Sequence, residues 1–154
     1  MLAGYANAQQ NGSGSYLQIS GEVTKPLIIH ADDLSSMKRT TVHLRERDGK
    51  DYAYTGVSIQ QILEMAGVTM GKQLRGEKLA SYVLVQSADG YKVLFSLAEL
   101  DSSFINRTVI LAWESEGKPL PADKGPFRLV VTGEKKPTRS SYQVTGLMVG
   151  SLKN

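Results

Sequence analysis

The sequence predicts an α+β fold with a mostly antiparallel or mixed sheet and a few short helices. Three observations support this fold class. Most apolar runs have the length of a strand, only two or three short segments have helical periodicity, and strand and helix patterns do not alternate regularly. The 154 residues, 41% of them hydrophobic, suffice for one self-sufficient core. We therefore expect a flexible N-terminal segment over residues 1–15 and a single domain over residues 16–154.

The first third of the chain has three strand patterns. Apolar and polar residues alternate over residues 16–23, apolar residues return over 27–29, and β-branched residues alternate over 41–44. Asp32 and Asp33 are suited to cap a short helical turn between the second and third of these strands. The Asp48-Gly49 pair predicts a turn after the third strand.

The clearest helix pattern begins at Ser58. Ser58 and Gln61 have the spacing of a capping box, and Gly67 is placed to end the helix. The apolar residues at helical spacing, which predict the buried face, are Ile59, Ile62, Leu63 and Ala66.

Strands dominate the second half of the sequence. Residues 82–86 and 91–95 flank Ala88-Asp89-Gly90 and read as a hairpin, because Asp-Gly favours a tight turn. Ser96 and Glu99 repeat the capping-box spacing and predict a short helix that ends near Ser102. Further strands are expected over residues 108–113, 127–131 and 142–149.

Composition excludes several function classes. The sequence contains no cysteine, which removes disulfides, thiolate metal sites, iron–sulfur clusters and cysteine nucleophiles. The net charge of +3 comes from scattered residues rather than a basic run, so we expect no nucleic-acid partner. No apolar stretch approaches the ~18 residues that span a bilayer, so we expect no direct membrane insertion. Catalytic-triad, phosphate-loop and dinucleotide-binding motifs are also missing.

The first residues carry a weak signal for export. Ala6-Asn7-Ala8 has the spacing of a signal-peptidase site, and Leu2-Ala3-Gly4 is compatible with the end of a signal-peptide apolar region. A cloning remnant or chance accounts for the same residues. We favour the first interpretation, which predicts a periplasmic protein whose signal peptide has been removed.

Several short motifs follow one another along the chain. They are residues 19–27, Asp33-Leu34, residues 54–57, Ile62-Leu63, Ala66-Gly67, residues 89–91, Leu111-Ala112, residues 117–120 and residues 125–130. In this order and spacing they resemble the molybdopterin-binding domain of the sulfite-oxidase fold. The resemblance implies that fold and a pterin or molybdopterin-like ligand.

The sequence departs from this family at the metal ligand. The resemblance implies that oxidoreductases of the family bind molybdenum through a cysteine thiolate just after a strand, and Glu46 stands at the corresponding place here. A hard carboxylate is a poor substitute for a soft thiolate, so we expect no molybdenum and keep Glu46 as a candidate ligand-binding residue. Lys124 stands before Gly125 where many of the redox enzymes have a histidine.

A cysteine-free branch of the family is similar to this chain: small exported pterin-binding proteins. This resemblance implies a non-redox module that relays ligand occupancy to the periplasmic domain of a membrane-bound cyclic-di-GMP enzyme. Enzymatic activity is uncertain, and the missing cysteine argues against it. The alternatives are a molybdopterin-dependent oxidoreductase, or a subunit of one, without the usual cysteine ligand, and an interaction domain that has lost its ligand.

A receptor for a pterin needs a stacking surface, a carboxylate for the amine edge and a cation for the acceptor atoms. Trp113 and Glu114 lie at the end of a predicted strand and offer the first two. The alternative is that Trp113 is a core residue and Glu114 a solvated turn residue. Arg128 is expected opposite Phe127 and Leu129, either as the cation of the pocket or as a cross-strand ion-pair partner.

The remaining candidates each have a structural alternative. Asp89 and Tyr91 fit the pocket rim, although turn geometry alone explains Asp89. His43 lies on a strand and faces either solvent or the pocket. Arg139, in the basic segment 135–139, is suited to an anionic ligand tail, an acidic partner or a lipid headgroup, or belongs to a solvated loop. His30 lies near Asp32 and Asp33, but the helix cap explains these aspartates and we expect no metal site.

Overall fold

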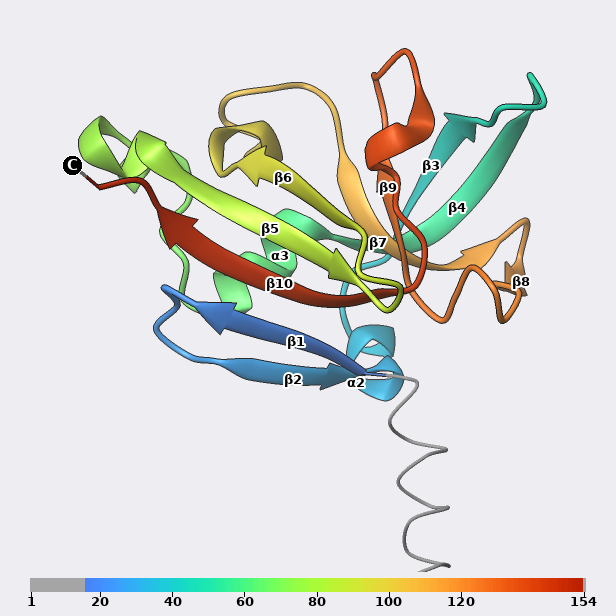
Figure 1. Cartoon of the computed structure of the whole chain (residues 1–154), viewed down its shortest axis with the longest axis horizontal. Helices are drawn as coiled ribbons and strands as arrows, with labels where there is room; N and C mark the ends of the chain where they lie inside the picture. The colour runs from blue at the N-terminus through green and yellow to red at the C-terminus, as the bar shows by residue number, and fades with distance from the viewer. Residues whose placement is uncertain (1–15, 154) are drawn as a thin grey trace, which may run out of the picture.

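The computed structural model describes residues 16–153, so the flexible segment predicted over residues 1–15 lies outside the described residues. Two sheets form the molecule (Figure 1). The first sheet contains five strands in the order β2 (Leu27–His30), β1 (Tyr16–Gly21), β10 (Val144–Ser151), β5 (Ser81–Ser87) and β6 (Lys92–Ser96). The second contains β3 (Thr40–Arg45), β4 (Asp51–Ser58), β7 (Val109–Ser115) and β8 (Lys118–Pro119), with β9 (Arg128–Val131) paired to β7.

The pairing within the sheets confirms the predicted fold class. Strands β1 and β10 run parallel, and every other described pair is antiparallel. The helical segments are all short: α2 (Ala31–Ser35), α3 (Ile59–Met65), and the 3-10 turns η1 (Gly71–Gln73), η2 (Gly76–Ala80), η3 (Ala98–Leu100) and η4 (Pro137–Arg139). Within residues 16–153, no helix has the length and apolarity needed to cross a bilayer.

The predicted helix after Ser58 is confirmed as α3. The Ser58 hydroxyl accepts a hydrogen bond from the Gln61 amide at 3.2 Å, and Gly67 follows the helix with a positive φ of 77°. Ile59, Ile62 and Leu63 are buried, as their spacing predicts. Both ends of this helix are therefore defined by local sequence.

The other two predicted helical segments differ in detail from the expectation. His30, rather than an aspartate, is the N-cap of α2, and Asp33 acts from inside the first turn by accepting the His30 amide at 2.8 Å. The Ser96–Glu99 box forms in both directions, at 3.3 and 2.9 Å, but it starts a single 3-10 turn, η3.

The segment with η1 and η2 has no counterpart among the predicted elements. The buried carboxylate of Asp101 accepts the Gly71 amide at 2.5 Å and the Ser103 amide at 2.8 Å. Because Asp101 lies 30 residues from Gly71, periodicity in a short window contains no trace of this contact.

Two hydrophobic clusters lie on opposite faces of the second sheet. The larger cluster joins both sheets and α3. The smaller cluster is Leu44, Tyr54, Ile110, Ala112 and Val130. Successive residues of β7 alternate between the clusters, which explains why its first four residues are apolar and buried without a polar gap. The smaller cluster supports the site described below.

Gly56 marks the closest approach of β4 to β7. A Cβ atom there would lie 1.9 Å from the Leu111 carbonyl oxygen, beside a bulge in the pairing of the two strands. Gly49 has a φ of +80° in the β3–β4 turn, but a Cβ atom at that position meets nothing within 4 Å.

Replacing each glycine by alanine is expected to lower stability by different amounts, because Gly56 lies against backbone whereas Gly49 only needs a positive φ. Gly56→Ala should lower the free energy of unfolding by about 3 kcal/mol because backbone must shift, and Gly49→Ala by only about 1 kcal/mol. Urea denaturation measures both values. Equal losses would contradict the close approach.

Candidate functional site

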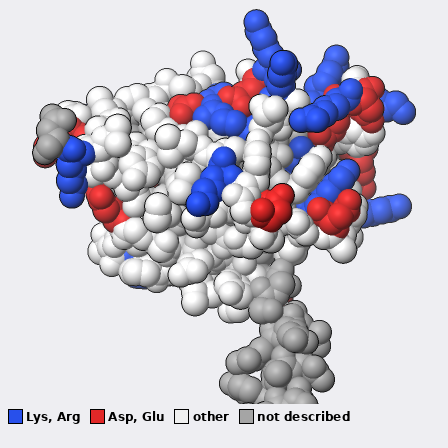
Figure 2. All heavy atoms as spheres, in the orientation of Figure 1, with Lys and Arg blue, Asp and Glu red and all other residues white. Residues whose placement is uncertain are grey.

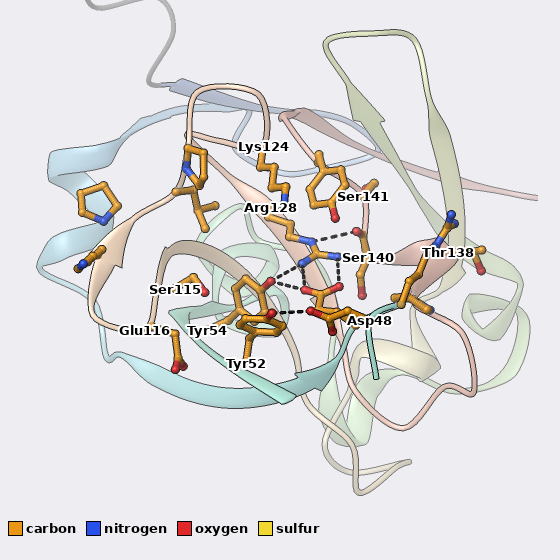
Figure 3. A pocket seen from close by; sticks show the side chains of 18 of the residues that line it. Asp48, Tyr52, Tyr54, Ser115, Glu116, Lys124, Arg128, Thr138, Ser140 and Ser141 are labelled. Carbon is orange, nitrogen blue, oxygen red and sulfur yellow. Dashed lines mark hydrogen bonds and ion pairs between the residues drawn. The ribbon is translucent and has the colours of Figure 1, made fainter. Parts of the chain in front are cut away.

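A pocket of about 810 Å³ opens on the face of the second sheet that carries the smaller cluster. Its lining comes from the β3–β4 turn, the first half of β4, the β7–β8 turn and the segments before and after β9. The tip of the β5–β6 hairpin, from the first sheet, completes the rim with Asp89 and Tyr91. Figure 3 shows Arg128 in the middle of this arrangement, between Tyr54 and Ser140.

Arg128 is only 2% exposed and organises the pocket. Its Nη1 donates to Glu46 Oε2 at 2.5 Å and to the Tyr54 hydroxyl oxygen at 2.7 Å. Its Nη2 donates to Glu46 Oε1 at 3.3 Å, and its Nε donates to the Ser140 carbonyl at 3.1 Å. Tyr54 also donates to Glu46, so the ion pair and the phenol form a closed network (Figure 3).

Strand alternation explains the position of Arg128. Phe127 and Leu129 belong to the larger core cluster, so Arg128 and Val130 face the opposite side of β9. The guanidinium carbon lies 4.3 Å from the centre of the Tyr142 ring and 5.0 Å from that of Tyr54. Two aromatic rings and one carboxylate thus compensate the burial of this charge.

Glu46 remains ionised in this setting. Burial acts to raise the pKa of its carboxyl, but the hydrogen bonds from Arg128 and Tyr54 and the charges of Arg128 and Lys124 outweigh it, so the pKa lies below its usual range. Burial and the hydrogen bond to Glu46 raise the pKa of the Tyr54 phenol. The network therefore holds one carboxylate, one guanidinium and one neutral phenol at neutral pH.

The pocket lining holds equal numbers of acidic and basic side chains, which are Glu46, Asp48, Asp89 and Glu116 against Arg47, Lys118, Lys124 and Arg128. Asp48 accepts from the Tyr52 hydroxyl at 2.5 Å, and Glu116 accepts from the Ala53 amide at 2.7 Å. Arg47, Lys118 and Lys124 line the pocket and form no ion pair within residues 16–153. In Figure 2, charged side chains crowd the half of the molecule that contains the second sheet, whereas the part over β5 and β10 is mostly uncharged.

Four of the predicted site residues line this pocket: Glu46, Asp89, Tyr91 and Arg128. Tyr91 donates its hydroxyl to the Thr138 carbonyl at 2.6 Å and so connects the β5–β6 hairpin to η4 across the rim. Asp89 accepts the Tyr91 amide at 2.9 Å, as the turn interpretation requires. The sequence left two alternatives for Arg128, a cation in the pocket or a partner in an ion pair. The structure combines them, because Arg128 lines the pocket and pairs with Glu46 just after β3.

Trp113 and Glu114 do not line the pocket. Trp113 packs against the larger core cluster, and the Arg39 guanidinium lies 5.5 Å from the centre of its ring. Glu114 pairs with the same arginine at 3.8 Å. Alternation along β7 places Trp113 on the same face as Val109 and Leu111, which belong to the larger cluster. The bulge, where Gly56 pairs with Ala112 and Thr55 with Glu114, shifts the faces after Trp113, so Ser115 rather than Glu114 lines the pocket.

His43 and Arg139 also lie outside the lining. His43 is exposed on the edge strand β3, opposite Ala53. Arg139 donates to Glu134 at 2.5 Å, to Glu99 at 2.9 Å and to the Leu94 carbonyl at 2.7 Å. It therefore fastens the chain around η4, which forms one wall of the pocket, to the first sheet.

Sequence patterns missed several lining residues. Tyr52 and Tyr54 alternate along β4, and this alternation was a usable signal for two aromatic rings on one face. Ser140, Ser141 and Tyr142 precede β10 in an irregular segment, where no periodicity indicates which side chains face the pocket.

Comparison with protein families gives the identity of the fold. Residues 8–136 match the family model of the oxidoreductase molybdopterin binding domain. The chain belongs to this family. The molybdopterin-binding domain found here is also similar in structure to the sulfane dehydrogenase SoxCD from Paracoccus pantotrophus, with a TM-score of 0.69 and 21% identity over 91% of this chain. It spans only 39% of that chain, and no curated protein matches the sequence.

The pocket of this molybdopterin-binding domain fits the pterin part of the cofactor better than the metal part. Its volume and its tyrosine rings suit a flat, polar heteroaromatic molecule. The 154 residues contain no cysteine, and both Glu46 oxygens are already engaged by Arg128. Residues 16–153 also contain no group of three or more side chains suited to hold a metal ion.

Arg128→Met is expected to lower the free energy of unfolding by about 3–5 kcal/mol, because it leaves the half-buried Glu46 carboxylate without its partner. The double variant with Glu46→Leu should recover most of this loss. Arg45→Met, which breaks the exposed pair with Asp51, serves as the matched control and should leave the free energy of unfolding nearly unchanged. Denaturant unfolding measures all three, and similar losses for Arg128→Met and Arg45→Met would contradict the network.

The lowered pKa of Glu46 predicts a pH dependence of stability. Because the folded-state pKa lies below the unfolded value of about 4.3, the carboxylate stabilises the fold above that pH, and this contribution disappears as pH falls through the folded-state pKa. The gap in unfolding free energy between the wild type and Glu46→Gln should therefore be widest at neutral pH and narrow below about pH 4. Denaturation curves across pH test this, and a constant gap would refute the assignment.

Proposed function

We propose that this domain binds a pterin in the pocket around Arg128 and does so without a redox reaction. The buried Arg128–Glu46–Tyr54 network is the observation that carries the proposal, because it places a fixed cation and aromatic rings at the bottom of a pocket in a molybdopterin-binding fold. A pterin is flat, carries acceptor and donor atoms at its edges, and matches these groups.

Each part of the pocket has a role in this proposal. The Tyr142 ring is 40% exposed, with the Arg128 guanidinium carbon 4.3 Å and Lys124 Nζ 5.5 Å from its centre, and in this proposal its exposed part contacts the pterin ring. Arg128 orients the acceptor atoms of the ring system. Lys118 and Lys124 attract an anionic substituent at the open side of the pocket, where neither has an ion-pair partner among the described residues.

The proposed absence of molybdenum rests on the chemistry of position 46. A thiolate donates a soft, covalent bond to a metal, whereas the Glu46 carboxylate is held by a guanidinium and a phenol. Recruiting Glu46 to a metal would leave the buried charge of Arg128 uncompensated. The ion pair therefore favours a metal-free ligand.

A second candidate is a subunit of a molybdopterin-dependent oxidoreductase. The family match and the fold shared with the sulfane dehydrogenase favour it. Because this chain spans 39% of that dehydrogenase chain, residues outside the matched part would have to complete such an enzyme. In that case the pocket would still hold the pterin portion of the cofactor, and the metal ligand would come from elsewhere.

Two further predictions extend the pterin-binding proposal. The resemblance to exported pterin-binding proteins suggests a periplasmic location and a relay of ligand occupancy to a membrane-bound cyclic-di-GMP enzyme. The contact between Tyr91 and Thr138 offers one physical route, since it joins the pocket wall to the hairpin of the other sheet. Co-purification with the enzyme's periplasmic domain, with and without pterin, tests the relay.

Pterin fluorescence titration tests the binding itself. The wild type should bind pterin in the absence of added metal, and Tyr142→Ala should weaken binding by about 1–3 kcal/mol through lost stacking. Trp113→Phe is the control, because Trp113 packs on the core outside the pocket and its replacement should leave affinity unchanged. Wild-type protein that binds no pterin, or loss of affinity in Trp113→Phe but not in Tyr142→Ala, would overturn the proposed site.

A further inference from the structure

Two buried hydroxyls in residues 16–153 have no hydrogen-bond partner: Ser87 Oγ and Ser141 Oγ. A buried hydroxyl without a partner costs stability, so most such groups in folded proteins are satisfied. The two serines differ in one respect, because Ser141 lines the pocket and Ser87 does not. Ser141 Oγ is itself closed to solvent, so it becomes available to a ligand when its side chain turns toward the pocket.

The backbone around Ser141 is firmly held. The Ser141 carbonyl accepts the Leu129 amide at 3.0 Å, the Ser140 carbonyl accepts Arg128 Nε at 3.1 Å, and the Ser140 hydroxyl accepts the Val131 amide at 2.9 Å. These bonds dock the segment on β9, while the Ser141 side chain stays uncommitted. A serine hydroxyl reorients about a single side-chain torsion, so Ser141 can direct its hydrogen to a bound molecule at little cost.

Arg128 provides a second uncommitted donor beside this segment. A guanidinium has five N–H groups, and four donate to Glu46 (two), Tyr54 and Ser140. The fifth, on Nη2, has no acceptor in the part of the chain that the structure describes. Arg128 and Ser141 both line the pocket and both are more than nine-tenths buried. Two spare donors in one pocket match an acceptor oxygen.

We propose that Ser141 is a specificity-determining residue whose hydroxyl, with the spare N–H of Arg128, donates to an acceptor oxygen of the bound ligand. The inference rests on the proposed pterin-binding function. In a pterin the oxygen is the ring carbonyl. The carboxylate of an acidic substituent, as in 6-carboxypterin, also offers an acceptor oxygen. Comparing ligands with and without each group shows whether the ring carbonyl or the carboxylate accepts the hydrogen bond.

The test compares Ser141→Ala with Ser87→Ala, the matched loss of the other unpaired hydroxyl. Affinity for pterin is measured by fluorescence titration. Ser141→Ala should weaken binding roughly three- to tenfold, as expected for one hydrogen bond, and Ser87→Ala should not change it. Both variants should unfold at the same or a higher denaturant concentration than the wild type, because no internal hydrogen bond is lost.

The second arm uses 2,4-diaminopteridine, which has an amine in place of the ring carbonyl, and 6-carboxypterin. If the ring carbonyl is the acceptor, Ser141→Ala should bind the diamine as the wild type does. A loss seen only with 6-carboxypterin would assign the oxygen to the acidic substituent and still support the proposal. An equal loss with all three ligands would overturn the proposal, because 2,4-diaminopteridine has neither the ring carbonyl nor the carboxylate, and reduced stability in the same variant would show a structural role.

Failure of this inference is distinguishable from failure of the proposed function. Wild-type protein that binds pterin and 6-carboxypterin, with both affinities unchanged in Ser141→Ala, refutes the role of Ser141 alone. Wild-type protein that binds none of the three ligands refutes both.

Discussion

The buried ion pair between Glu46 and Arg128 is the constraint on which the pocket depends. The ion pair joins the residue after β3 to β9. Arg128 Nε also donates to the Ser140 carbonyl, which holds the lining segment Ser140–Tyr142 in place. A guanidinium at 2% exposure is tolerated only because a carboxylate, a phenol oxygen and two aromatic rings surround it. The same groups that compensate this charge form the bottom of the pocket, so stability and binding share residues.

The pocket is assembled from segments that are far apart in the sequence. Arg128 and Glu46 are separated by 82 positions, and Tyr91 and Thr138 by 47. The Arg139 cluster with Glu99 and Glu134 adds a further attachment between the η4 wall and the first sheet. These long-range contacts attach the η4 wall of the pocket to the first sheet and to its β5–β6 hairpin.

Capping and alternation patterns predicted most helices and strands, whereas contacts between distant segments determine which side chains line the pocket. The N-cap at Ser58 and the alternation around Arg128 depend on neighbours within four residues, so both could be inferred from the sequence. The position of Glu114 could not, because the bulge opposite Thr55 and Gly56 shifts the faces of β7 after Trp113. Ser141 and Tyr142 face the pocket because the preceding strand holds their segment, and no pattern within the segment contains that information.

The central claim is that the pocket holds a pterin without molybdenum. Native mass spectrometry of the protein isolated from its own cells, with elemental analysis of the same sample, tests this claim most directly. The account predicts an added mass equal to that of a simple pterin and no stoichiometric molybdenum. An added mass equal to that of the complete metal cofactor, with one molybdenum per chain, would contradict it and restore the oxidoreductase.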